Sequence, residues 1–116
     1  MSEERDISGV LAILDDDYAR AILEATRQTQ MSAKELSEEC NMSVSTVSRR
    51  VNTLLKYDLL VERTHMDPDG HHYSEYEAQL DRVEVQLLKS GFDVRIELRE
   101  DAPDRFSRLW DTMRND

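Results

Sequence analysis

Residues 32–66 read SAKELSEECNMSVSTVSRRVNTLLKYDLLVERTHM, and this stretch decides the fold. Ser32 followed by Glu35 has the spacing of a capping box, in which each residue binds the backbone N–H of the other, and predicts the start of a helix. Apolar residues recur along that helix at positions that share one face, which we expect to be buried: Ala33, Leu36 and Cys40.

A second helix is expected over about 44–57, shortly after the first. Asn41 tolerates a left-handed backbone, so it suits the position just past a helix end, and Ser43 is a favourable N-cap for the next helix. The apolar positions of the second helix keep helical spacing: Val44, Val47, Val51, Leu54 and Leu55.

After Asp58 the pattern changes from helical to extended. Residues 60–66 read as a strand, Asp-Pro-Asp-Gly at 67–70 as a type I turn that closes on a bulge glycine, and 71–77 as the returning strand. Two helices joined by a tight turn and followed by a β-hairpin predict a winged helix-turn-helix.

Two helices are expected before this stretch. Asp6 can cap a short helix whose apolar face is Ile7, Val10, Leu11 and Leu14. The acidic run 15–17 ends it and supplies an N-cap for a helix over about 18–29. The inward stripe of that helix is expected to be Tyr18, Ile22, Leu23 and Thr26.

The C-terminal part predicts a second hairpin over 80–98 and a final helix over 102–114. Apolar residues alternate along the two strands, around a turn at Ser90-Gly91: Val83, Val85 and Leu87, then Phe92, Val94, Ile96 and Leu98. The fold class is therefore α+β. A winged helix-turn-helix is expected over 6–77, and 80–114 extends the same compact unit.

The charge balance describes the surface. The 116 residues carry 25 acidic and 15 basic side chains, for a net charge of −10, and only three of the basic residues are lysines. An acidic, lysine-poor surface stays hydrated in concentrated salt, which favours a halophilic protein, although an ordinary acidic mesophilic protein remains an alternative. We expect a soluble, cytoplasmic protein without a membrane segment.

One region of the sequence has no acidic residues. Residues 40–57 contain no Asp or Glu and three cations, Arg49, Arg50 and Lys56. A polyanion such as DNA is the simplest reason for it. The outward positions expected to enter the major groove are Ser45, Thr46, Arg49 and Asn52, with Arg49 suited to bind guanine bidentately.

Other residues are better placed for the DNA backbone. Ser43, Ser48 and Arg50 are candidate phosphate contacts, although helix capping is the stronger reading of Ser43. On the wing the candidates for phosphate or the minor groove are Arg63, His65 and His71. The partner is therefore expected to be double-stranded DNA.

The stretch quoted above, with the preceding DYARAILEAT at 17–26, resembles winged-helix transcriptional regulators, most closely the ArsR-like proteins of halophilic archaea. Ser37 stands where the family usually has Ala, and Asn41 where Gly is commonest. The resemblance covers about residues 6–77 and implies a regulator that binds DNA and acts on the basal transcription machinery. It also implies a homodimer formed through terminal helices, for which the candidate residues are Leu11, Phe106, Leu109, Trp110 and Met113, with burial of Phe106 and Trp110 in the core as the alternative.

Alternative functions remain open. His65, His71 and His72 fall within eight residues and could bind a metal, but such a site needs further convergent ligands, so no metal is expected. ArsR-like metal sensors use paired cysteines, whereas Cys40 is alone, which favours a small buried residue over a redox sensor. A winged-helix protein-interaction module is another alternative. No catalytic motif is present, so we expect neither an enzyme nor a cofactor.

Overall fold

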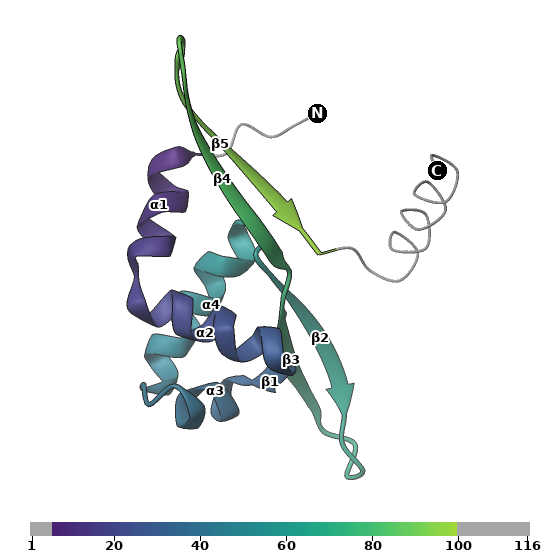
Figure 1. Cartoon of the computed structure of the whole chain (residues 1–116). Helices are drawn as coiled ribbons and strands as arrows, with labels where there is room; N and C mark the ends of the chain where they lie inside the picture. The colour runs from purple at the N-terminus through teal and green to yellow at the C-terminus, as the bar shows by residue number, and fades with distance from the viewer. Residues whose placement is uncertain (1–5, 100–116) are drawn as a thin grey trace, which may run out of the picture.

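The structure is a computed structural model that describes residues 6–99. The first part of the chain forms α1 (Ile7–Asp15), α2 (Asp17–Gln28), β1 (Met31–Ser32), α3 (Ala33–Glu39) and α4 (Val44–Lys56). The second part forms β2 (Leu60–Met66), β3 (His72–Ala78), β4 (Leu80–Leu88) and β5 (Gly91–Leu98) (Figure 1). The expected helix over 102–114 lies outside the described residues. No helix within 6–99 is long and apolar enough to cross a membrane.

The strands form two separate antiparallel sheets. One has the order β1-β3-β2, and the other contains β4 and β5 alone. The wing hairpin β2–β3 was expected, and β3 begins at His72, one residue later than the sequence indicated. Strand β1 was missed: its two residues, Met31 and Ser32, pair with Tyr76 and Glu75 of β3. Two residues are too few to show the alternation that marks a strand, so only the tertiary pairing reveals it.

Local capping follows the sequence closely. The Ser32–Glu35 capping box is complete, with Glu35 N–H donating to Ser32 Oγ at 3.2 Å and Ser32 N–H to Glu35 Oε1 at 2.9 Å. Asn41 has a φ of 54° and turns the chain between α3 and α4. In the wing turn, Gly70 N–H donates to Asp67 O at 2.9 Å and the glycine has a φ of 86°. These features confirm the expected turn chemistry.

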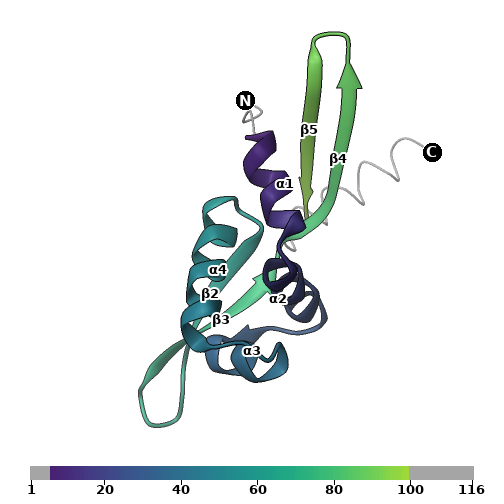
Figure 2. The same cartoon turned by 90° about the vertical axis from the view of Figure 1, so that its left-hand side faces the viewer.

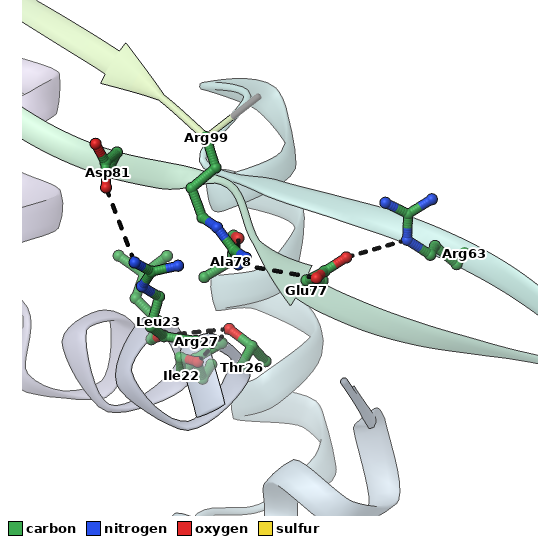
Figure 3. Close-up of polar contacts among 9 residues, drawn as sticks. All are labelled: Ile22, Leu23, Thr26, Arg27, Arg63, Glu77, Ala78, Asp81 and Arg99. Carbon is green, nitrogen blue, oxygen red and sulfur yellow. Dashed lines mark hydrogen bonds and ion pairs between the residues drawn. The ribbon is translucent and has the colours of Figure 1, made fainter. Parts of the chain in front are cut away.

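The core is one apolar cluster between the helices and the three-stranded sheet. Its members come from α1, α2, α3, α4, the start of β2 and the end of β3. The most deeply buried of them are Ile22, Leu36, Val47, Leu54 and Leu59. Among residues 6–99 Thr26 is the buried polar residue, and its hydroxyl donates to Ile22 O at 2.7 Å (Figure 3). The buried stripe expected for residues 22–26 is therefore confirmed.

Three positions expected to face inward are exposed instead: Leu11, Tyr18 and Val44. Tyr18 and Val44 lie in the first turns of their helices, where the helix end extends beyond the core, and Ala19 and Met42 are buried nearby. In α1 the buried residues are Val10 and Ile13, so the inward face is rotated from the expected one. Asp6 occupies the N-cap position of α1, but its side chain makes no capping hydrogen bond.

The β4–β5 hairpin is fixed to the domain at its base. Arg99 N–H donates to Gln79 O at 2.6 Å, and its guanidinium donates to Ala78 O at 3.2 Å. Arg27 of α2 lies 3.9 Å from Asp81 at the start of β4 (Figure 3). From this base the hairpin extends beside α1, away from the wing, and the tips of the two hairpins lie at opposite ends of the molecule (Figures 1 and 2).

Candidate nucleic-acid interface

Helix α4 packs one face on the core and presents the other to solvent. Val47, Val51 and Leu54 are buried against the rest of the domain. On the opposite side the exposed side chains are Ser45, Ser48, Arg49 and Asn52, while Thr46 is half-buried. Helix α3 packs against α4, and Asn41 and Ser43 set the angle between them. The structure therefore brings the expected base-reading residues together on one exposed helix face.

Hydroxyl groups form a small network at the N-terminus of α4. Ser43 Oγ accepts the Thr46 N–H at 3.1 Å and lies 2.9 Å from Thr46 Oγ1 and 3.1 Å from Ser45 Oγ. Arg49 Nη2 donates to Thr46 Oγ1 at 3.5 Å. Ser43 is thus a helix cap, as expected, and the network points the Arg49 guanidinium along the first turn of the helix.

Arg49 keeps its positive charge unpaired within residues 6–99, where it has no ion pair with an acidic side chain. Its side chain is exposed. A guanidinium with no acidic partner, and with only one long hydrogen bond to a neighbouring hydroxyl, can bind a planar, bidentate acceptor.

Arg50, the next residue, has different surroundings. Its Nε pairs with the Asp16 carboxylate, and its guanidinium lies over the Tyr18 ring at 5.4 Å from the ring centroid. The Asp16 side chain also caps α2 by accepting the Tyr18 N–H at 3.0 Å. We expected Arg50 to contact phosphate, but its guanidinium instead forms an ion pair that links α4 to the N-cap of α2. The sequence carries no signal for this pairing, which joins residues 34 positions apart.

The basic side chains of the wing also have acidic neighbours. Arg63 Nε donates to Glu77 Oε1 at 3.1 Å (Figure 3). His65 Nε2 lies 3.1 Å from Glu75 Oε1, and its ring stacks on Tyr73 with 5.5 Å between centroids. His71 is exposed and lies 3.8 Å from Asp67 Oδ2. The wing therefore offers phosphate fewer free hydrogen-bond donors than its sequence indicates.

The three histidines do not form one metal site. His65 is opposite Tyr73 and His72 is opposite Met66, so the two lie on opposite faces of the hairpin. The cluster found within the described residues is Asp67, Asp69 and His71 at the wing turn. Asp67 Oδ1 there accepts the backbone N–H groups of Asp69 and His71 at 3.0 and 2.9 Å. One carboxylate oxygen of Asp67 is thus occupied by hydrogen bonds that stabilise the turn.

Cys40 lies at the C-cap of α3 and is half-buried. Its thiol lies 3.7 Å from Ala21 O, in a position to donate a weak hydrogen bond. Burial raises the pKa of the Cys40 thiol, and the nearby carboxylates of Glu39 and Glu24 raise it further. A raised pKa lowers the thiolate fraction at neutral pH, so the site disfavours redox sensing.

This predicts slow alkylation of Cys40. In native protein at pH 7–8, iodoacetamide is expected to modify Cys40 more slowly than it modifies free cysteine, because less of the buried thiol is ionised. The rate is expected to keep rising as the pH passes the ordinary thiol pKa. Mass spectrometry of a time course measures it, with urea-unfolded protein as the control. A native rate equal to or above the unfolded rate would contradict the prediction.

The comparisons with known proteins agree with this geometry. Residues 14–63 match the family model described as a helix-turn-helix domain, a segment that runs from the end of α1 to the middle of β2. No curated protein matches the chain. The matched segment contains α3, the Asn41 turn and α4. The chain therefore carries a helix-turn-helix domain, the kind of DNA-binding module on which transcriptional regulators are built.

Proposed function

We propose that this protein is a sequence-specific regulator of transcription that binds double-stranded DNA with α4 in the major groove. Its base-reading residues are Ser45, Thr46, Arg49 and Asn52, and Ser48 contacts phosphate beside them. It acts by binding, without catalysis or a cofactor.

The observation that carries this proposal is the exposed face of α4. In a chain of net charge −10, residues 40–57 contain no acidic side chain, and Arg49 has no acidic partner within 6–99. The neighbouring exposed groups are hydroxyls and an amide, which hydrogen-bond to base edges. A protein-interaction helix would more often present apolar or acidic side chains at these positions.

The wing makes the second contact in this proposal. Arg63 lies about midway along β2 with its side chain 48% exposed, so a phosphate can replace Glu77 as its partner. His65 and His71 lie further toward the tip. Because the wing is internally paired, its contribution is smaller than that of α4 and concerns position on the duplex, not sequence.

The remaining parts of the proposal concern the oligomeric state and the cellular environment of the protein. The protein acts as a homodimer through Leu11 and the C-terminal residues Phe106, Leu109, Trp110 and Met113, on half-sites about 34–36 Å apart. The scarcity of lysine and the resemblance to ArsR-like proteins support a cytoplasmic regulator of a halophilic archaeon that acts on the basal transcription machinery. In concentrated salt, close fit and hydrogen bonds then supply more of the affinity than charge does.

Selection from genomic fragments in molar KCl tests the function. We expect a recurrent sequence to be enriched, and methylation of guanine N7 within it to block binding, because N7 faces the major groove. The unmethylated fragment and a scrambled duplex are the controls. Absence of an enriched sequence, or binding indifferent to N7 methylation, would overturn major-groove reading.

A further inference from the structure

The β4–β5 hairpin has one face made only of apolar side chains. In its register, Val83 is opposite Ile96, Val85 opposite Val94, and Leu87 opposite Phe92. Directly opposed residues in an antiparallel pair point to the same side, so these six side chains share one face. The other face is mainly polar and charged, with Glu84 opposite Arg95 and Gln86 opposite Asp93. The hairpin is therefore amphipathic from residue 83 to residue 87, and Leu88 at the tip is an exposed apolar residue on the other face.

The core covers this face only at the base of the hairpin. Ile96 packs against the core cluster, and Val83 and Val94 are half-buried. Toward the tip, which extends beyond the domain in Figure 2, the exposed fractions are 44% for Val85, 71% for Leu87 and 66% for Phe92. An isolated two-stranded hairpin is marginally stable in water, and contiguous exposed apolar side chains mark an interaction surface.

We propose that a second copy of this chain docks on the apolar face of the β4–β5 hairpin. This rests on the homodimer of the proposed function and names the surface through which it forms. The six side chains of this face are uncharged, whereas the chain as a whole carries −10. Two such chains therefore approach with least repulsion at this face. An amphipathic hairpin is also self-complementary, since two copies related by a two-fold axis pack as a two-layer sandwich about 10 Å thick.

Helix α1 lies beside the base of β5, and its Leu11 is exposed. The apolar face from residues 83 to 87 is about 13 Å long and about 10 Å wide, at about 3.3 Å per residue and about 4.8 Å between strands. A standard interface buries about 800 Å² per partner, so this face is one part of the contact between the two copies.

Leu87→Glu in the full-length protein tests the proposal by light scattering after size-exclusion chromatography in molar KCl. The wild type is expected at twice the chain mass of 13.5 kDa. Leu87→Glu is expected to raise the dimer dissociation constant about 30-fold or more, because it buries an unpaired charge in the interface. Gln86→Glu adds the same charge on the opposite face of β4 and is expected to leave the dimer intact.

Several results would overturn the proposal. These are a monomeric wild type, a Leu87→Glu variant that dimerises like the wild type, and equal weakening by Gln86→Glu. A monomer in which Leu87→Glu red-shifts the fluorescence of Trp110 would show instead that the chain covers the face with its own C-terminal segment. Leu87 is exposed and lies outside the core, so circular dichroism is expected to show unchanged folding.

A DNA-binding assay distinguishes failure of this inference from failure of the proposed function. Binding of Leu87→Glu to a single half-site is expected to equal that of one wild-type chain, because the tip of the hairpin points away from the N-terminal end of α4 (Figures 1 and 2). If half-site binding is retained and Leu87→Glu does not weaken the dimer, this inference alone is overturned. Loss of all sequence-specific binding by an intact dimer would overturn the proposed function alone.

Discussion

Arg49→Ala is expected to lower the preference for the selected DNA site over a scrambled duplex by about 1–3 kcal/mol, or about 5- to 150-fold. The guanidinium is exposed, is held by Thr46 Oγ1 at 3.5 Å and has no acidic partner within residues 6–99. A bidentate contact to guanine O6 and N7 uses these properties, and alanine removes both hydrogen bonds. Fluorescence anisotropy with both duplexes at one molar KCl concentration measures the ratio.

Arg95→Ala is the matched control for Arg49→Ala. It removes the same side chain from an exposed position on β5, so net charge changes equally. We expect it to leave the specificity ratio unchanged. If Arg49→Ala and Arg95→Ala alter the two affinities alike, Arg49 acts only through general charge, and its assignment as a base-reading residue is wrong.

Leu54→Ala is expected to lower the free energy of unfolding by about 2–5 kcal/mol. Leu54 is fully buried in the core, on the inner face of α4. Truncation loses the transfer free energy of the removed methyl groups and leaves a cavity that the surrounding helices fill only in part. Urea unfolding followed by circular dichroism, in the molar KCl used for DNA binding, gives the free energy and the transition midpoint.

Val44→Ala on the same helix is the control for Leu54→Ala. Helical spacing places Val44 with the buried residues, but in the structure it is 53% exposed. We expect a change within about 0.5 kcal/mol, as for most exposed substitutions. A decrease in the free energy of unfolding comparable with that of Leu54→Ala would mean that Val44 is buried, and would contradict its exposed position at the N-terminus of α4.

Much of the fold was predictable because its signals are local. The Ser32–Glu35 box, the Ser43 cap and the wing turn each depend on residues a few positions apart, and all three form as expected. Periodicity was less reliable at helix ends, as Tyr18 shows, because it identifies a face but not where the core stops. Asp58 was missed as well: it has a φ of 63°, in a conformation that residues other than glycine adopt rarely.

Arg49 and Arg50 show where the candidate site stops being predictable. They are adjacent and chemically identical, and their difference arises because successive residues are about 100° apart around a helix. One therefore faces solvent beside Thr46, while the other reaches Asp16 and Tyr18. The partner lies 34 residues away in the sequence, so neither composition nor spacing indicates which arginine stays free.

Within residues 6–99, the sequence alone determined the order of the helices and the two hairpins, the caps of α2, α3 and α4, and the acid-free helix that suggests DNA, because these depend on neighbouring residues and on simple counts. Only the tertiary structure decided which charges are already paired, such as Arg63 with Glu77, and where apolar side chains remain exposed, as on the β4–β5 hairpin. The physical reason is that ion pairing and burial are properties of groups brought together by folding across long stretches of chain.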